Sequence, residues 1–465
     1  MAYIGRKVIY TDEAEITSGN VVNVLRDAYM THSANRTEIE YLYKYYKGDQ
    51  PILYRVKQVR PEINNRVVVN RANEIVSFKS GYLMGEPIQY IAKGKGENLA
   101  EKIQVLNDYM YSESKASVDM SVADWFHICG TAYKLIMPDD NGDEDDAPFE
   151  IYSLDPRNTF VVYYSGLGHK PVMGVTYVTD KDGNDTFSVY THNAYYEIKG
   201  EKVIFEQNHI LGDIPIIEYY ANDARLGAFE IVLGMLDAMN TVESNRVDGI
   251  EQFVQALMVF YGVDIDSDTF KALRENGGLK VPPDGDVKYL IQELNQTQSQ
   301  TVIDDMYQTV LTICGMPNRN GGSSTSDTGS AVIMRDGWSD AEARAKNSER
   351  CFKKSEMSFL KIAIRICNFS RHLDLKPLNI DIRFTRRNYE NIQMKSQVLT
   401  TMLANGKIHP QLAFTHCGMF ADPDLAYEMS EQYAKEQEQK AQEMFEKSQE
   451  EVNPDEKKVE EPENE

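Results

Sequence analysis

Apolar residues recur every three or four positions through the first quarter of the chain, a spacing that predicts amphipathic helices. The predicted helices cover residues 20–47, 66–84, 99–112 and 116–128. Gly48 follows the first pattern directly and is expected to end it. The period then changes to short runs rich in Val, Tyr, Phe and Thr, separated by turn sequences such as Asp182-Gly183-Asn184. We therefore expect an antiparallel β region over about 130–207.

A much longer helical pattern with one broad apolar face begins at Ala228 and continues to about Gly262. At 1.5 Å per residue this would be a rod of about 52 Å, several times the usual length of a globular helix. An insert over 263–294 follows, and a second helical pattern over 295–316 leads back. Two helices joined by a small insert predict a stalk that carries a knob, with Pro282, Pro283 and Asp284 at the tip of the knob.

The chain beyond this predicted stalk begins with a stretch rich in glycine and serine, residues 317–338, which cannot hold a rigid structure alone. A long helix is expected from about Asp340 to Arg371, since Ser339 and Glu342 have the spacing of a capping box. The remaining expected elements are a strand near 378–384 and helices over 392–404 and 423–444. Asp422 is placed as the N-cap of the last helix, with Pro423 in its first turn.

Composition indicates a globular chain, with 42% hydrophobic residues in a total of 465. The chain has 72 acidic and 49 basic residues and a net charge of −23, which argues against wrapping nucleic acid on a basic surface. No apolar run is long enough for a membrane span, and the N-terminus lacks the apolar core of a secretion signal. Five dispersed cysteines without a CxxC pair predict reduced thiols. Residues 445–465 are predicted to be a disordered acidic tail.

The acidic run Asp139–Glu150 is the strongest candidate for a cation site. Its carboxylates match several positions of a helix-flanked calcium loop. However, Glu144 stands where the loop requires glycine, Pro148 lies at position 10, and the flanks are predicted strands. A solvated turn is favoured, and adventitious binding of a divalent cation remains the alternative.

Other candidate chemistry has weak support. Gly94-Lys95-Gly96 and Gly321-Gly322 lack the lysine and hydroxyl residue of a phosphate-binding loop. The eight histidines show no metal-binding spacing, and we expect no metal, cofactor or enzymatic activity. The aromatic and lysine residues of 41–47 could stack on a single strand, but a helix end packed into the core is the favoured interpretation. Arg386 and Arg387 could contact phosphate or form a salt bridge at a strand end.

The order of several short motifs resembles the portal proteins of tailed bacteriophages, in the branch of long-tailed phages of Gram-positive bacteria. The resembling stretches are Tyr45–Leu53 (YYKGDQPIL), Asn64–Asn70, Gly81–Ile88 (GYLMGEPI), Gly315–Pro317, Gly321-Gly322, Thr328–Ala331, Phe384–Asn388 and Gly406–Ile408. They cover about residues 35–430, and their order is more specific than any one of them.

The resemblance implies an α+β fold, mainly α, with a wing, a stem of long helices, a small α/β clip and a helical crown. The wing would comprise 1–227 and 339–390. The stem would be the two helices over 228–262 and 295–316. The implied clip is 263–294, the tunnel loop 317–338 and the crown 391–444.

The resemblance also implies a function. Portal proteins form a ring, usually of twelve subunits, at one capsid vertex. The ring is the channel through which double-stranded DNA is packaged and ejected without sequence specificity. The implied partners are further copies of the chain, the terminase large subunit, a head–tail adaptor, and capsid and scaffolding proteins, with no membrane. The implied location is the virion, with assembly in the host cytoplasm.

Two sets of residues are expected to meet the DNA in such a ring. The tunnel loop would present polar side chains and glycines, namely Asn320, Gly321, Gly322, Ser323, Ser324, Thr325 and Ser326. Stem acids would repel the duplex and keep it from sticking, and the candidates are Glu243, Asp248, Glu251, Asp304 and Asp305. The same acids could instead form salt bridges between subunits.

Two functions of other classes remain open from the sequence. One is a divalent-metal-dependent nuclease that uses the acids of 139–146. The other is a helical scaffold or minor capsid protein that forms no ring. A nuclease assay and electron microscopy of the purified protein distinguish these from a portal.

Overall fold

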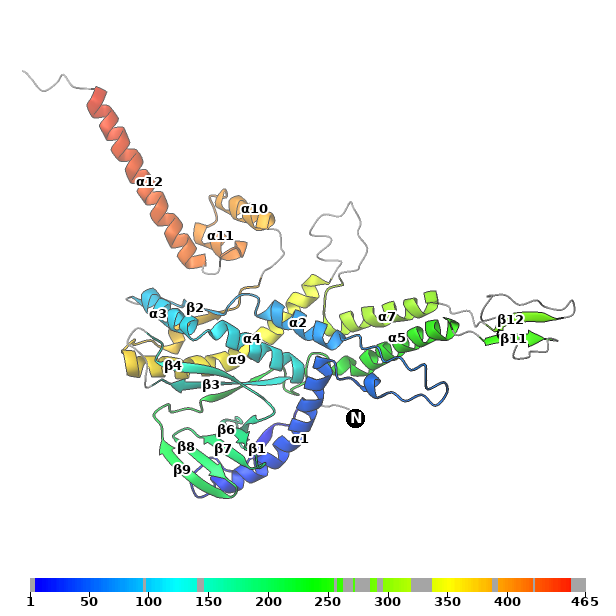
Figure 1. Ribbon diagram of the computed structural model, residues 1–465. Coiled ribbons are helices and arrows are strands. Elements are labelled where there is room, and N and C mark those ends of the chain that lie inside the picture. Colours follow the sequence, from blue (N-terminus) through cyan, green and yellow to red (C-terminus); the bar gives the residue numbers. More distant parts are fainter. Residues whose placement is uncertain are drawn as a thin grey trace, which may run out of the picture.

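The computed structural model contains helical and stranded layers from which a hairpin of two helices projects (Figure 1). It describes residues 5–94, 98–139, 146–254, 257–261, 271, 285–290, 296–318, 337–386, 392–420 and 423–452. The helices are α1 Val21–Lys47, α2 Arg71–Leu83, α3 Leu99–Ser112, α4 Lys115–Cys129, α5 Leu233–Val254, α7 Gln296–Cys314, α9 Trp338–Arg371, α10 Ile392–Leu403, α11 Pro410–Cys417 and α12 Pro423–Val452. Short 3₁₀ helices are η1 Pro51–Tyr54, η2 Glu230–Val232 and η3 Pro377–Asn379.

The strands of the described residues form four sheets. They are β1 Ile9–Thr11, β2 Gln89–Ala92, β3 Thr131–Pro138, β4 Phe149–Leu154, β5 Thr159–Tyr164, β6 Pro171–Thr179, β7 Asp185–Tyr190, β8 Ala194–Lys199, β9 Lys202–Asn208, β10 Ile216–Tyr220, β11 Leu257–Tyr261, β12 Asp286–Leu290 and β13 Ile380–Arg383. One sheet has the order β1-β5-β6-β7-β8-β9, another β10-β3-β4, and two are the pairs β11-β12 and β13-β2.

The predicted antiparallel region is present but is divided between two of these sheets. β5 to β9 follow one another as antiparallel neighbours, whereas β3 and β4 pair with β10. The edge strand β1 pairs in parallel with β5, with Ile9 opposite Val162. β1, β2 and β10 were not expected, because each is fixed by pairing with a strand distant in sequence.

Helix α1 packs across the six-stranded sheet with its N-terminal half. Val21, Leu25 and Ala28 contact a core that includes Val175 and Ile198 of that sheet. Gly48 adopts a left-handed conformation with φ +101° after the helix, and its amide contacts the carbonyls of the last turn. The predicted helix over 20–47 and its glycine stop are therefore confirmed.

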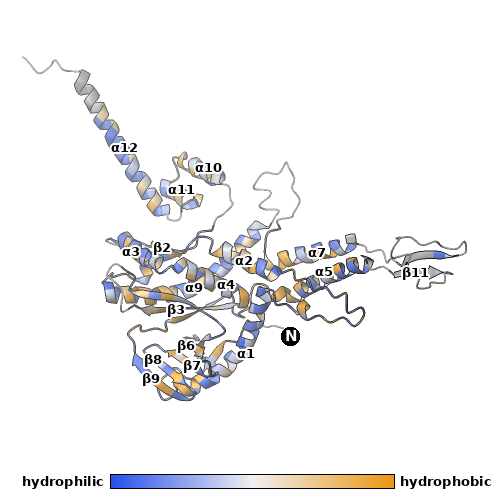
Figure 2. Ribbon diagram, viewed as in Figure 1, coloured by the Kyte–Doolittle hydropathy of each residue, from blue (hydrophilic) through white to orange (hydrophobic). Residues whose placement is uncertain are grey.

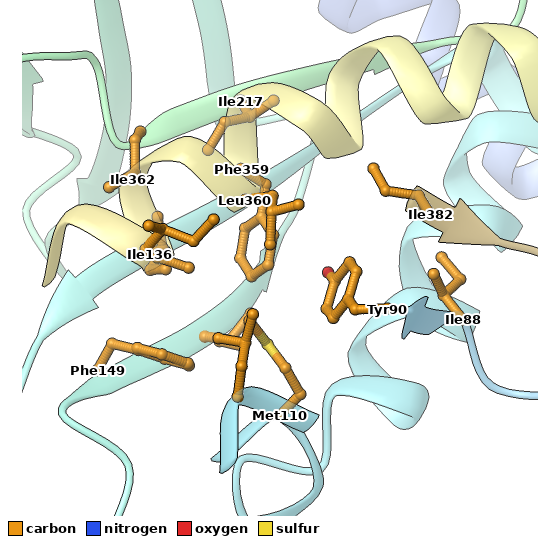
Figure 3. Packing of buried hydrophobic residues seen from close by; sticks show 14 of the residues in the cluster. Ile88, Tyr90, Met110, Ile136, Phe149, Ile217, Phe359, Leu360, Ile362 and Ile382 are labelled. Atoms are coloured by element: carbon orange, nitrogen blue, oxygen red, sulfur yellow. The ribbon is translucent and has the colours of Figure 1, made fainter. Parts of the chain in front are cut away.

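A second core lies between α9, the three-stranded sheet and the helices α3 and α4. Figure 3 shows Phe359 and Leu360 of α9 facing Ile136 of β3, with Met110 and Phe149 completing the cluster. Within this apolar core lies a buried ionic group, which we call the ionic quartet: Lys115, Asp119, Lys134 and Glu356. Lys134 contacts Asp119 at 2.5 Å and Glu356 at 3.0 Å, and Lys115 contacts Glu356 at 2.7 Å and also pairs with Asp119.

The ionic quartet is neutral overall and its carboxylates have further donors. Tyr90 and Tyr219 donate hydrogen bonds to Glu356, at 2.6 and 2.5 Å. Burial by itself raises the pKa of Glu356, but the charges of Lys115 and Lys134 outweigh it and hold that pKa well below its usual range. The ion pairs of the quartet therefore link α4, β3 and α9 inside the core.

Four predicted boundaries were wrong. The long helical pattern from Ala228 ends as a helix at Val254, and Leu257–Tyr261 is a strand. The helix predicted over 66–84 begins only at Arg71, because the side chain of Asn70 caps it by accepting a hydrogen bond from the amide of Asn73. Trp338 already begins α9 behind Gly337 at φ +81°, so Ser339 is inside the helix and no capping box forms. The last helix continues to Val452, so the expected acidic tail cannot begin at 445.

The C-terminal helices form a separate group in Figure 1, and α12 extends away from the body as a largely hydrophilic helix (Figure 2). Their first and last members, α10 and α12, were predicted, whereas the short helix α11 was not. Pro423 is the first residue of α12, as expected, while the predicted N-cap Asp422 lies outside the described residues.

Candidate functional site

The hairpin of α5 and α7 projects from the body of the described chain (Figure 1). Its base is a hydrophobic cluster in which Leu236 and Met239 of α5 meet Val310 and Leu311 of α7, together with residues of α1 and α2. At the far end, β11 and β12 pair antiparallel, with Leu257 opposite Leu290. The predicted stalk is therefore present, but with α5 of 22 residues, about 33 Å long, rather than a 52 Å rod.

One side of α5 is held by an extended segment, residues 63–70, that runs along it. We call this segment the arm. Its backbone amides donate to side chains of α5: Val69 to Asn240 at 2.8 Å, Val67 to Ser244 at 3.0 Å and Asn65 to Asp248 at 2.7 Å. Three side chains of α5, spaced four residues apart, thus accept hydrogen bonds from three amides of the arm, spaced two residues apart.

The spacing of this ladder follows from elementary geometry. Four residues of helix advance about 6 Å, and two residues of extended chain advance about 6.6 Å. The match lets a helix provide the acceptors that an extended backbone requires. The amides of Asn65, Val67 and Val69 are thus satisfied without a neighbouring strand.

Asp248 is the charged end of the ladder, and it is only 3% exposed. Its carboxylate contacts Lys57 at 3.0 Å and Arg55 at 3.3 Å, as well as Asn65. Burial raises the pKa of Asp248, but hydrogen bonds from Asn65 and Lys57 exceed that effect and lower it overall. Asp248 was a predicted candidate for facing DNA, and its side chain is buried and paired within its own subunit, so we do not include it among the proposed DNA-facing acids.

Glu243 and Asp304 belong to a polar bridge between the two helices. Arg246 contacts Glu243 at 3.5 Å and donates to Gln300 at 2.9 Å, and Gln300 donates to Asp304 at 2.8 Å. Asp304 is exposed and Glu243 is half-buried.

The other two predicted acids lie on the same hairpin. Glu251 is half-buried and accepts a 2.8 Å hydrogen bond from Asn65, and Asp305 is exposed on α7. With Asp237 and Asp248 included, α5 and α7 carry six acidic residues and one basic residue, a net of −5.

Comparison with known proteins agrees with this architecture. The family model described as "Phage portal protein, SPP1 Gp6-like" matches residues 28–443. The chain belongs to the phage portal protein family. Portal proteins are structural components of the phage particle. No curated protein is similar enough to this chain to count as a match.

A solved structure titled "Neck of empty GTA particle computed with C6 symmetry" contains a chain that resembles this portal protein. The two are 10% identical, with a TM-score of 0.47, over 75% of this chain and 90% of the other.

The expected tunnel loop of this portal protein, residues 317–338, is described only at its ends. Arg344 of α9 donates to the carbonyls of Ile313 at 2.8 Å and Thr312 at 3.4 Å, and so caps the C-terminus of α7. A Cβ on Gly337 would lie 3.8 Å from Pro317, so the segment between them starts and ends at neighbouring points. The predicted contact residues Asn320–Ser326 lie outside the described residues.

The expected clip of the portal protein is also described only in part. Within 263–294 the structure describes Lys271 and residues 285–290, which contain β12, while the predicted tip Pro282–Asp284 lies outside the described residues. The partner strand β11 precedes the expected clip. The acidic run Asp139–Glu150 connects β3 and β4, so its predicted strand flanks are confirmed, and Asp140–Asp145 lie outside the described residues.

The remaining sequence candidates have structural roles. Tyr45 is buried, its hydroxyl donates to Asp237 at 2.9 Å, and Lys44 and Lys47 are exposed, which confirms the interpretation as a helix end in the core. Arg386 pairs with Glu342 at 3.0 Å and Glu349 at 2.8 Å.

The described residues show neither a metal-binding cluster nor a membrane-spanning helix. No group of three or more His, Cys, Asp or Glu side chains within them is arranged to hold a metal ion. None of the described helices combines the length and apolar character that a bilayer span requires.

Sequence reasoning missed the arm and its contacts with α5. A detectable pattern existed, because Asn240, Ser244 and Asp248 form a polar stripe at intervals of four along α5. Such a stripe needs partners when it is buried. What the pattern could not provide was the identity of those partners, since Asn65 is 183 positions away.

Proposed function

We propose that copies of this portal protein close into a ring in which α5 and α7 of each copy line a channel for double-stranded DNA. The observation that carries the proposal is the hairpin itself. Its base is packed into the body by Leu236 and Val310, whereas its outer part presents Glu243, Asp304 and Asp305. A projecting acidic hairpin on a portal protein suits the inner wall of such a channel.

The charge of the hairpin agrees with the need for DNA to slide. A basic wall would neutralise phosphates, release counterions and bind tightly. An acidic wall repels the duplex over about 8 Å at physiological salt. Leaving out Asp237, which accepts a hydrogen bond from Tyr45, and Asp248, which is paired with Lys57 and Arg55, α5 and α7 carry −3 per copy, or −36 for twelve copies. The proposed DNA-facing acids are Glu243, Glu251, Asp304 and Asp305.

The parts of the chain next to the hairpin take the roles that a portal requires. In this proposal the insert 263–294, with Pro282, Pro283 and Asp284 at its tip, docks the terminase large subunit and later the head–tail adaptor. The wing and crown regions contact capsid and scaffolding proteins. Assembly takes place in the host cytoplasm, and DNA passes without sequence-specific contacts.

The Gly/Ser-rich segment 317–338 is proposed as the tunnel loop. Support comes from its flanks, since the Arg344 cap and Gly337 fix both ends at neighbouring points beside α7. Glycine and serine lower the cost of backbone movement. Deleting Gly321–Ser326 should leave rings intact and impair packaging, and normal DNA-filled heads from that deletion would refute the assignment.

Charge reversal on α7 tests the channel proposal. The double variant Asp304→Lys/Asp305→Lys should slow the packaging of DNA into heads, because lysines facing the duplex would bind its phosphates. The matched control is Asp182→Lys/Glu201→Lys, which makes the same charge change in exposed turns of the six-stranded sheet. Ring formation is checked first for both. Equal packaging rates in the two variants would contradict the proposal.

A further inference from the structure

An open groove of about 650 Å³ lies along one face of α9 near its C-terminal end. The face of α9 provides Met357, Lys361, Ile364 and Arg365, while η3 and the end of β2 add Leu378 and Lys93. Met357 and Asn368 bound the groove on α9, eleven residues apart, so it follows about 17 Å of helix. That length is about three turns of a second helix laid alongside.

The mouth of the groove is basic although the chain as a whole carries a net charge of −23. Lys93 and Lys361 are exposed, and across the described ranges neither they nor Arg365 form an ion pair. Arg365 donates to the backbone carbonyl of Leu211, which fixes its guanidinium at one side of the groove. Three cations at one concave site attract negative charge.

The floor of the same groove is apolar. Ile364 is buried, Met357 is half-buried, and Leu378 is 85% exposed at the edge. Covering Leu378 and Met357 would remove apolar surface from water, which favours binding. Phosphate groups of a nucleic acid would use the cations but would leave this apolar surface uncovered.

We propose that this groove docks an acidic amphipathic helix of a partner protein. The partner's apolar stripe would cover Met357, Ile364 and Leu378, and its carboxylates would approach Lys93, Lys361 and Arg365. Two observations support the assignment: the three cations complement an acidic partner, and the groove is as long as about three turns of a helix. The C-terminal part of α9, which lines the groove, lies at the end of the body away from the α5–α7 hairpin (Figure 1), so the partner would not enter the proposed channel. The inference goes beyond the proposed function and does not depend on it.

The test is fluorescence anisotropy on the full-length protein. The probe is a labelled 14-residue model helix with leucines on one stripe and glutamates elsewhere. The same peptide with lysines in place of glutamates is the control probe. We expect the glutamate peptide to bind and the lysine peptide to bind at least tenfold more weakly. Equal binding of the two peptides would overturn the proposal.

Variants locate the binding to the groove. Lys93→Glu/Lys361→Glu and, separately, Leu378→Asp should each raise the Kd of the glutamate peptide by about tenfold. Lys181→Glu, in an exposed turn between β6 and β7, should change it less than twofold. Circular dichroism confirms that each variant is folded. Unchanged affinity in both groove variants would overturn the assignment.

Two further probes test the other possible occupants. A 20-base-pair DNA duplex and a synthetic peptide of residues 445–465 are each used as competitors of the glutamate peptide. Failure of both to displace it supports a partner protein. Displacement by the duplex at lower concentration would replace the proposal with nucleic-acid binding, and displacement by the 445–465 peptide would replace it with the chain's own acidic segment.

Discussion

The carboxylate of Asp248 accepts a 2.7 Å hydrogen bond from the backbone amide of Asn65, a residue 183 positions earlier in the chain. The same carboxylate pairs with Lys57 and Arg55. This contact ends the ladder by which the arm is fixed to α5. Residues 240–248 of α5 are therefore fixed by a segment from the N-terminal part of the chain, in addition to the apolar packing at the base of the hairpin.

Asp248→Asn tests the charged end of this ladder. Asparagine keeps an oxygen for the Asn65 amide but loses both ion pairs, and we expect the free energy of unfolding to fall by about 1–2 kcal/mol. The measurement is urea denaturation. Asp305→Asn removes the same charge from an exposed site on α7 and should change stability by less than about 0.5 kcal/mol. Equal effects of the two substitutions would show that the ion pairs of Asp248 add nothing to stability.

Gly315 tests the junction between α7 and the proposed tunnel loop. It has φ +63°, and a Cβ there would lie 2.0 Å from Cδ of Arg344, the residue that caps α7. Gly315→Ala should therefore destabilise the protein by about 2 kcal/mol.

Gly234→Ala is the control for this junction, because it lies within helical α5 with open space around it and should be neutral or stabilising by about 0.5–1 kcal/mol. Thermal unfolding compares the two. A Gly315→Ala protein as stable as the Gly234→Ala protein would refute the tight junction.

The sequence predicted the helices with strong periodicity and clear ends. α3 at Leu99–Ser112 has the expected bounds, and α7 at Gln296–Cys314 ends within two residues of the expected 295–316. It failed where distant partners decide the outcome. The apolar run Leu257–Tyr261 continues the helical pattern of α5, and periodicity cannot distinguish a short buried helix from a strand. Pairing with Asp286–Leu290 makes it a strand.

The candidate site was predicted only in outline, because local sequence shows the helices but not their distant partners. The two helices and most of their acids follow from local sequence, so Glu243, Asp304 and Asp305 could be named in advance. The role of Asp248 could not, because it depends on Arg55 and Lys57, which no local pattern connects to α5.

The ionic quartet provides a third prediction. Glu356→Gln would leave two buried lysines with one carboxylate, and we expect a loss of about 3–5 kcal/mol in unfolding free energy. Adding Lys134→Met restores neutrality, with Lys115 and Asp119 still paired. The double variant should therefore be less destabilised than the sum of the two single variants. Additive losses, measured by chemical denaturation, would show that the four groups act independently.

The buried His32 gives a fourth prediction, on pH. Burial lowers the pKa of His32 to about 4, and its Nε2 contacts the Arg157 carbonyl at 3.0 Å. The ordinary pKa of histidine is 6.5. Between pH 6.5 and 4 the imidazole of His32 therefore binds a proton in the unfolded chain but not in the folded chain. Stability should fall as pH drops from 6.5 toward 4, by up to about 1.4 kcal/mol per pH unit for this residue.

His32→Gln should flatten that pH dependence by about 1 kcal/mol per pH unit, whatever its effect on absolute stability. His416→Gln, on the exposed side of α11, should leave the slope unchanged. Urea denaturation at pH 6 and pH 4.5 provides both slopes. An unaltered slope in the His32 variant would mean that the histidine is protonated in the folded protein.

Electron cryomicroscopy of the purified full-length protein tests the central claim most directly. We predict annular particles in which α5 and α7 of every subunit lie nearest the axis, with Asp304 and Asp305 toward the opening. Monomers, or rings in which this hairpin lies on the outer surface, would contradict the claim.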